Sequence, residues 1–245
     1  MIEETVSVTT RSGAMQTFVC RPERSDPHPV VLFLMDAPGI REELRDMVRR
    51  LAAPGYCVVL PNLYYRSGVM ELGPIPRRAE GPLIPKIIAL MNGLSVAMVM
   101  DDVDALFKFL DVHPGARPGP AACIGYCMSG RFAVNAAARW PQRIKAVASI
   151  HGTELATSAA DSPHRMASST RARLYFACAE HDEEAPLEMI GRLDAALRAE
   201  ALDAEVEIYQ GAQHGFAFTQ RDAYCRDAAE RHWERLFQLL QATVS

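Results

Sequence analysis

The sequence lacks the features that mark several classes of protein. No apolar run approaches the roughly 20 residues that a membrane-spanning helix needs, and the first residues have no signal-peptide character. Lysine and arginine form no block, and the formal net charge is only -4. This balance gives no reason to expect a nucleic-acid or membrane partner. We therefore expect a cytoplasmic protein, a monomer or a homodimer, that acts on a small molecule.

The cysteines form neither a zinc motif nor a redox motif. No CxxC pair occurs, and Cys123 and Cys127 have no other ligand types close to them in sequence. We expect free thiols and no metal. Cys57, Cys123 and Cys178 lie in strand-like runs and are predicted to be small buried residues.

The order of apolar segments predicts the fold class. Strand-like runs alternate with helical segments along 245 residues, which fit one large domain over 1–245. This alternation predicts an α/β fold with a mainly parallel, doubly wound sheet and helices on both faces. Residues 63–94 look irregular, with scattered glycine and proline, and favour a functional loop such as a lid. Strands are expected at 5–10, 15–20, 30–35, 56–60, 121–124, 146–150, 174–179 and 206–209, and helices at 42–53, 96–110, 131–140, 187–197 and 228–240.

One hexapeptide carries most of the functional information. Gly125-Tyr126-Cys127-Met128-Ser129-Gly130 follows an apolar strand and begins a helix. A strand, a tight turn with a nucleophile at its apex and a helix form a nucleophile elbow, whose strained turn needs small neighbours. Here the apex is cysteine, which predicts an α/β-type hydrolase with a thiol nucleophile.

A thiol nucleophile needs a base, and the base needs an orienting acid. In this fold the chain order is nucleophile, acid, histidine, each after a strand. Asp182 and His214 satisfy this order after Cys127, and we predict a Cys127, Asp182, His214 triad. Alone, each could be a structural or surface residue. The acid has rivals in Glu180, Glu183 and Glu184.

The other histidines are weaker candidates. His181 would reverse the required order. His151 follows a strand and could line the pocket, although a capping or packing role is favoured. No function is predicted for His28, His113, His164 and His232, which are interpreted as loop or surface-helix residues.

These segments together resemble the dienelactone hydrolase family, the carboxymethylenebutenolidase-like α/β hydrolases. The resemblance is carried by the hexapeptide, by Glu180-His181-Asp182 and His214-Gly215-Phe216, and by residues 34–39 and 59–64. It extends over roughly residues 4–240. It implies an α/β-hydrolase fold and hydrolysis of an ester or lactone through a thioester acyl-enzyme, without metal or organic cofactor.

The resemblance also implies roles for further residues. It assigns the oxyanion hole to the backbone N–H groups of Met128 and Ala37, which fits their places after the nucleophile and in a neighbouring strand-to-helix loop. It assigns to Asp36 an acid that helps to form the thiolate, although Asp36 is shorter than the family's usual glutamate. The alternative for Asp36 is a turn-capping role before Pro38.

Two departures from the family concern the elbow and the substrate. Ser129 stands where the family has glycine, and Phe218 lies where dienelactone-specific members have a carboxylate-binding arginine. Arg66, Arg77 or Arg78 could bind an anion instead, or simply be exposed. A less polar ester or lactone would fit the aromatic residues Tyr64, Tyr65, Phe216 and Phe218.

Two other functions compete with a dienelactone-like hydrolase. One is a broad carboxylesterase or thioesterase, which uses the same residues. The other is a non-hydrolytic redox-sensing or binding protein that uses the Cys127 thiol. Such a protein has no need of Asp182 and His214 in triad order.

Overall fold

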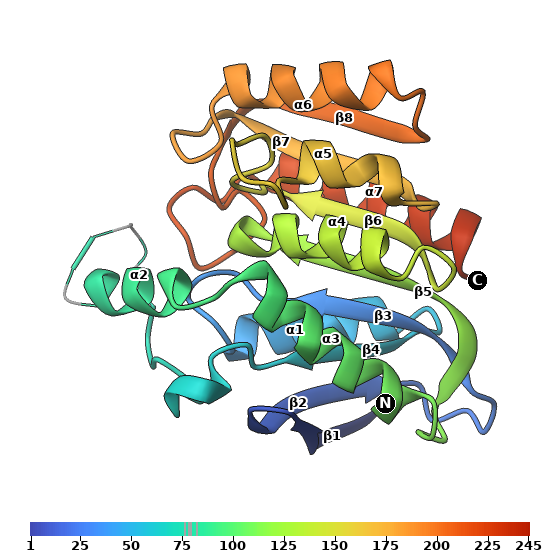
Figure 1. The fold of residues 1–245 in the computed structure, drawn as a ribbon. Coiled ribbons are helices and arrows are strands. Elements are labelled where there is room, and N and C mark those ends of the chain that lie inside the picture. Colours follow the sequence, from blue (N-terminus) through green and yellow to red (C-terminus); the bar gives the residue numbers. More distant parts are fainter. Residues whose placement is uncertain (76, 78–79, 82) are drawn as a thin grey trace.

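One sheet of eight strands forms the centre of the structure, a computed structural model that describes residues 1–75, 77, 80–81 and 83–245 (Figure 1). The strand order is β1-β2-β4-β3-β5-β6-β7-β8. β2 runs antiparallel to both β1 and β4, and the other neighbours are parallel. The strands are β1 (Ile2–Thr10), β2 (Gly13–Arg21), β3 (His28–Leu34), β4 (Cys57–Pro61), β5 (Ala116–Tyr126), β6 (Ile144–Ile150), β7 (Arg173–His181) and β8 (Ala204–Gln213).

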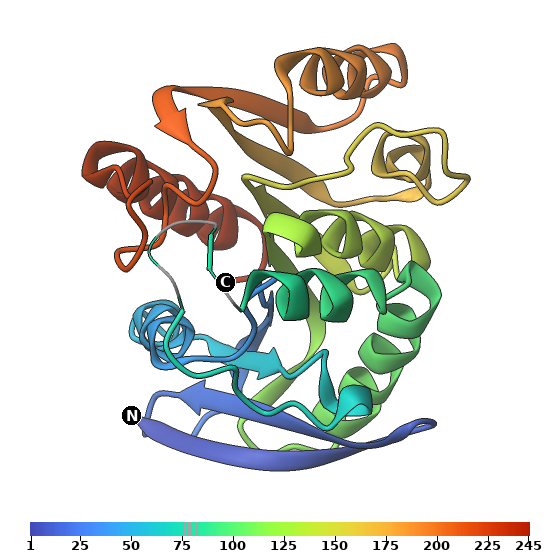
Figure 2. The same cartoon turned by 90° about the vertical axis from the view of Figure 1, so that its left-hand side faces the viewer.

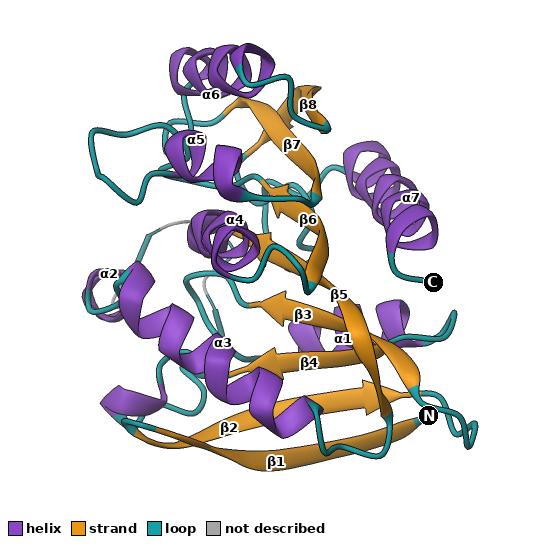
Figure 3. Cartoon of the chain, turned by 45° about the vertical axis from the view of Figure 1, so that its right-hand side comes forward, coloured by secondary structure: helices purple, strands orange, loops and turns teal. Residues whose placement is uncertain are grey.

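Helices cover both faces of this sheet, which confirms the predicted fold class. Figure 3 shows α1 and α7 on one face and α3, α4 and α6 on the other. In α1 the buried Leu44, Met47, Val48 and Leu51 recur at helical spacing and face the sheet. The helices are α1 (Glu42–Ala52), α2 (Ile84–Asn92), α3 (Val96–Leu110), α4 (Gly130–Arg139), α5 (Pro163–Met166), α6 (Leu187–Ala199) and α7 (Arg226–Thr243), with short 3-10 turns η1 (Tyr65–Ser67), η2 (Cys127–Ser129) and η3 (Ala167–Ser169).

The central strands explain where the core and the site lie. β3 is apolar on both faces, and Val31, Leu32 and Phe33 are fully buried, as expected for a parallel strand covered on both sides. β3 and β5 are neighbours, and the connection after β3 leads to β4 on one side whereas the connection after β5 leads to β6 on the other side. Ligands of open α/β sheets bind in the crevice at the carboxyl ends of such strands. Figure 2 looks onto this edge of the sheet, and α2 lies across it.

The prediction that residues 63–94 are irregular is wrong for 84–92, which form α2. Pro85 lies in the first helical turn, where its missing N–H costs nothing. Gly93 follows the last helical residue and ends the helix. A lid role for this connection remains a prediction.

The described part of the chain contains no single helix that is long and apolar enough to cross a membrane. α2 and α3 reach that length and composition only together, as a pair bent by 78°.

Candidate active site

The turn between β5 and α4 has the strained geometry of a nucleophile elbow. Cys127 has φ of 53°, in the left-handed region that a non-glycine residue rarely adopts. A Cβ on Gly125 would lie 2.1 Å from the backbone oxygen of Ser129, and one on Gly130 would lie 2.3 Å from Oγ of Ser149. Both positions therefore require glycine, which is why the turn can present the Cys127 sulfur above the end of β5.

Ser129, the departure from the family's usual glycine, has a structural partner. Its hydroxyl donates a hydrogen bond to the backbone oxygen of Met35, at 2.5 Å. The backbone oxygen of Cys127 in turn accepts from the N–H of Thr153, at 3.2 Å. These bonds tie the elbow to the loops that follow β3 and β6.

Three predicted residues meet at the elbow. Nε2 of His214 lies 3.2 Å from Sγ of Cys127, and Nδ1 lies 2.7 Å from Oδ2 of Asp182. The other carboxylate oxygen of Asp182 accepts the backbone N–H groups of Glu184 and Ala185, at 3.0 and 3.1 Å. The Asp182 side chain is fully buried, whereas that of His214 is 22% exposed. The carboxylate is thus fixed from both sides and the imidazole is reachable.

The surroundings of His214 favour its protonated form. Burial by itself would lower the pKa of the imidazole, but the charge of the Cys127 sulfur and the hydrogen bonds to Asp182 and Cys127 outweigh burial. The pKa of His214 is therefore raised well above 6.5. At neutral pH this arrangement favours an imidazolium beside the Cys127 sulfur.

Neither Glu180 nor Glu184 takes the place of Asp182 beside Nδ1 of the His214 imidazole. Glu180 accepts the backbone N–H of Gly211 at 2.7 Å. Glu184 has a half-exposed side chain, and its Oε2 is 3.9 Å from Nε2 of His214, on the side of the sulfur. The Cys127 sulfur, His214 Nε2 and a Glu184 oxygen lie within 4.8 Å of one another, a donor set that could hold a metal ion. Such an ion would compete with the hydrogen bond between His214 and Cys127.

A cavity of about 670 Å³ opens over Cys127 and His214. Asp36, Ala37 and Phe218 also line it, and α2 contributes a wall of aliphatic side chains. A second cavity, of about 550 Å³, lies between β7, β8 and α7 and shares no residue with the first. The first cavity is therefore the candidate substrate site.

Asp36 is bound to an arginine that the sequence analysis did not single out. Arg41 donates to Oδ1 and Oδ2 of Asp36, at 2.6 and 3.1 Å, and also to Glu43, at 2.8 and 3.0 Å. All three side chains are buried. Burial would lower the pKa of Arg41, but the two carboxylates raise it. The carboxylate of Asp36 thus faces Arg41, and its role in activating Cys127 remains a prediction.

The two predicted oxyanion residues lie beside the nucleophile. Ala37 lines the cavity, and Met128 follows Cys127 in η2. Tyr64, predicted to bind substrate, lies behind this loop and is buried. Its hydroxyl donates to the backbone oxygen of Ala37 at 2.7 Å and contacts the Met128 sulfur at 3.6 Å. Tyr64 therefore holds the loop and does not line the cavity.

Of the three arginines predicted to bind an anion, one lines the cavity, one is bound to a buried aspartate, and one lies outside the described residues. Arg66 binds the fully buried Asp102, at 2.7 and 2.8 Å, and is not among the residues that line the cavity, so its substrate contact stays a prediction. Arg77 lines the cavity and pairs with Asp222 at 2.9 Å. Arg78 lies outside the described residues.

Of the two phenylalanines predicted to contact substrate, Phe216 and Phe218, only Phe218 is among the residues that line the cavity. Phe218 lines the cavity, and the Arg41 guanidinium lies 4.8 Å from its ring centroid. Phe216 is fully buried and stacks on Tyr209, with 5.0 Å between ring centroids. Phe216 is not among the residues that line the cavity, and its substrate contact stays a prediction.

Two buried histidines pack behind the triad. His151 lies 4.9 Å from His214 between ring centroids, and neither ring nitrogen has a hydrogen-bond partner among the described residues. Burial, followed by the charge of His214, lowers the pKa of His151 well below 6.5. His232, interpreted as a surface residue, is instead fully buried on α7, and its Nε2 lies 3.2 Å from the hydroxyl of Tyr126. The surface interpretation of His232 is wrong.

Two features of the site were not predicted from the sequence: Arg41, and the four residues of α2 that line the cavity, called here the α2 wall. A signal for the wall was present, because its residues repeat at positions i, i+3, i+4 and i+7, which is helical spacing. Arg41 carries no such signal, because its buried partners are known only from the fold. The α2 wall consists of Ile84, Ile87, Ile88 and Met91.

Comparisons with known proteins identify the family and support the fold. The sequence pattern of the dienelactone hydrolase family matches residues 15–244. A protein of Synechocystis sp., provisionally named a carboxymethylenebutenolidase, is 26% identical over 98% of this chain and 96% of its own length. One of Escherichia coli with the same provisional name is 29% identical over 95% of this chain and 84% of its own length. A provisionally assigned dienelactone hydrolase structure from Klebsiella pneumoniae superimposes with a TM-score of 0.85 at 25% identity, covering 98% of each chain.

Proposed function

The chain belongs to the dienelactone hydrolase family and has the α/β-hydrolase fold, and on that premise we propose that it cleaves a carboxylic ester or lactone through Cys127. The single observation that carries the proposal is the line of hydrogen bonds from Asp182 through His214 to Cys127, with the sulfur at a strained turn. The names of the relatives, carboxymethylenebutenolidases, support the same class of bond.

The proposed reaction has an acylation step and a hydrolysis step. The thiolate of Cys127 attacks the carbonyl carbon, and the amides of Met128 and Ala37 stabilise the oxyanion. The C–O bond then breaks, His214 gives its proton to the leaving oxygen, and a thioester remains on the sulfur. Water loses a proton to His214 as it attacks the thioester. The C–S bond breaks, which releases the acid and restores the thiolate.

The direct test is the mass of the protein during turnover of a slowly cleaved aryl ester. We expect a transient species heavier by one acyl group, located on the peptide that contains Cys127. A panel with a dienelactone, aryl esters and a thioester then separates a lactonase from a broad carboxylesterase or thioesterase. Oxidation of Cys127 by mild peroxide, without cleavage of any ester, would favour the redox-sensing alternative.

The raised pKa of His214 predicts a pH dependence. The imidazolium should persist well above pH 6.5, so kcat/KM should fall at alkaline pH only where His214 loses its proton. Asp182→Asn removes the carboxylate that stabilises the imidazolium, so this alkaline limb should move toward neutral pH. The lost charge-assisted hydrogen bond should lower kcat/KM by about 10- to 100-fold. The measurement is the pH profile of kcat/KM for an aryl ester.

The matched control for Asp182→Asn is Glu184→Gln, which neutralises the other acid near the ring. Its oxygen is 3.9 Å from Nε2, beyond hydrogen-bond distance, and its side chain is 55% exposed. We expect the alkaline limb to stay in place. If Glu184→Gln moves the limb and Asp182→Asn does not, Glu184 is the acid and the triad is wrongly assigned.

A further inference from the structure

One face of α2 forms a wall of the cavity that contains Cys127 and His214. Ile84, Ile87, Ile88 and Met91 repeat at i, i+3, i+4 and i+7, so they form one stripe on the helix. All four line the cavity that contains Cys127 and His214. At 1.5 Å per residue the stripe is about 10 Å long. This length exceeds what the contact with a small ring would need.

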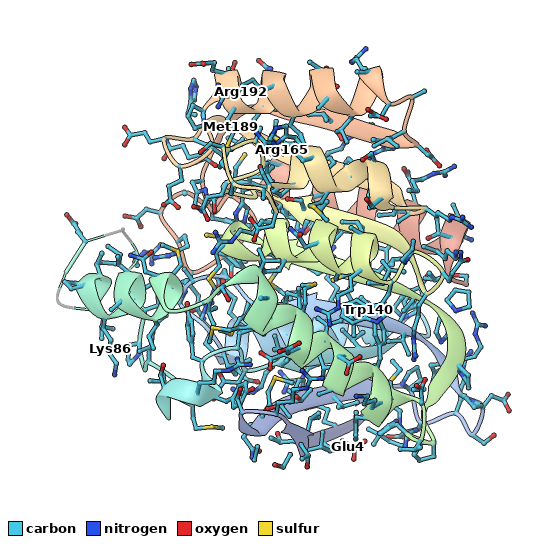
Figure 4. The ribbon with its side chains drawn as sticks, in the orientation of Figure 1. Glu4, Lys86, Trp140, Arg165, Met189 and Arg192 are labelled. Carbon is cyan, nitrogen blue, oxygen red and sulfur yellow. The ribbon has the colours of Figure 1, made fainter. Side chains whose placement is uncertain are left out.

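The stripe is apolar and partly open. Ile87 is buried, whereas the side chain of Ile88 is 45% exposed, although isoleucine normally avoids water. The exposed residues outside the stripe include Lys86, labelled in Figure 4 at the outer edge of the molecule. An apolar helix face that lines a catalytic cavity is suited to contact an apolar ligand.

The described charges around the cavity come close to balance. The lining carboxylates are Asp36, Glu184 and Asp222, the lining guanidinium groups are Arg77 and Arg221, and Asp36 is already paired with Arg41. Arg77 is paired with Asp222. Phe218 adds a further apolar surface to the cavity.

From these observations we propose that the substrate is an ester with a linear aliphatic chain of medium length, which lies along the Ile84–Met91 stripe while its carbonyl faces Cys127. The inference rests on the proposed function and names its substrate class. The aliphatic chain is part of either the acyl group or the alcohol of the ester, and in both cases methylene groups contact α2. A cavity of about 670 Å³ lies within the range of roughly 300–1,000 Å³ typical of small-molecule sites.

The test is a series of aryl esters with acyl chains from acetyl to decanoyl, and a parallel series of acetates with lengthening alcohols. We expect kcat/KM to rise in one of the series by up to about fourfold per methylene until the stripe is covered. The series that rises identifies the end of the ester that carries the chain. Falling or flat kcat/KM in both series would overturn the inference and leave the hydrolase proposal intact.

The variant Ile88→Asp places a charge in the middle of the stripe, at an exposed position where the fold should tolerate it. It should abolish the chain-length preference, so that kcat/KM no longer rises from acetyl to decanoyl esters. The matched control is Lys86→Gln on the outer side of the same helix, which should keep the wild-type series. An unchanged series in Ile88→Asp contradicts the proposal.

A binding measurement makes the inference independent of turnover. Methyl ketones resemble the ester carbonyl and are not cleaved, so they can be added to the Cys127→Ala protein. We expect its melting temperature to rise with ketone chain length, and this rise to vanish when Ile88→Asp is added. If no ester is cleaved but long ketones bind, the proposed hydrolysis fails and the apolar site stands; if neither is observed, both fail.

Discussion

Replacement of Cys127 by alanine should lower kcat/KM for aryl esters by at least about three orders of magnitude. The variant keeps the oxyanion groups and the cavity but has no atom that can form the thioester, so any remaining activity reflects binding and electrostatics alone. The fold should persist, because the side chain is small and lies at the edge of the cavity. Steady-state kinetics and the absence of an acylated species by mass would check this.

The matched control is Cys225→Ala, which removes the cysteine that is not buried. Cys225 precedes α7 and does not line the cavity, so this variant should retain wild-type turnover. It also leaves Cys127 as the thiol reachable from the cavity, which simplifies labelling experiments. Wild-type activity in Cys127→Ala would mean that another group is the nucleophile, and the hydrolytic mechanism proposed for this site would have to be abandoned.

The sequence predicted the triad because local rules specify it. The glycine two residues before the nucleophile is required by a contact inside the turn itself, so this part of the pattern is visible without the fold. The glycine three residues after the nucleophile is required by Ser149 and Gly152, which only the fold brings close. Asp182 and His214 follow strands, and the carboxyl ends of parallel strands meet at one edge of the sheet. Chain order was therefore enough to bring three distant residues together.

The substrate side of the site could not be predicted in this way. Arg66 and Phe216 have residue types suited to ligand contact, but a buried Asp102 and a stacked Tyr209 engage them instead. Asp102 lies 36 residues from Arg66, and Tyr209 lies 7 residues from Phe216. Only the packing of the elements decides whether each side chain contacts this partner or a ligand. The α2 wall was missed because its apolar residues lie in a stretch with many glycines and prolines, although Pro85 lies in the first helical turn, where proline is tolerated.

Replacement of Arg41 by methionine should lower the free energy of unfolding by about 3–5 kcal/mol. Methionine fills much of the same volume, but it leaves the buried carboxylates of Asp36 and Glu43 without their cation. Glu43 also accepts from the hydroxyl of Thr219 and from the backbone N–H of Gln220, at 3.1 and 2.9 Å. The buried network therefore joins the loop after β3 to the segment that follows His214, and its loss should loosen the cavity as well. Chemical denaturation measures the change.

Two comparisons separate a buried-charge effect from a general loss of arginine. Arg198→Met breaks an exposed pair with Asp194 on α6 and should cost no more than about 0.5 kcal/mol. The triple variant Asp36→Asn, Arg41→Met, Glu43→Gln removes the stranded charges together with the cation, so it should be more stable than Arg41→Met alone. If the triple variant is instead the least stable, the network acts through hydrogen-bond geometry and not through charge balance. In that case Asp36 is held by Arg41 as a structural group, and the prediction that it activates Cys127 loses its physical basis.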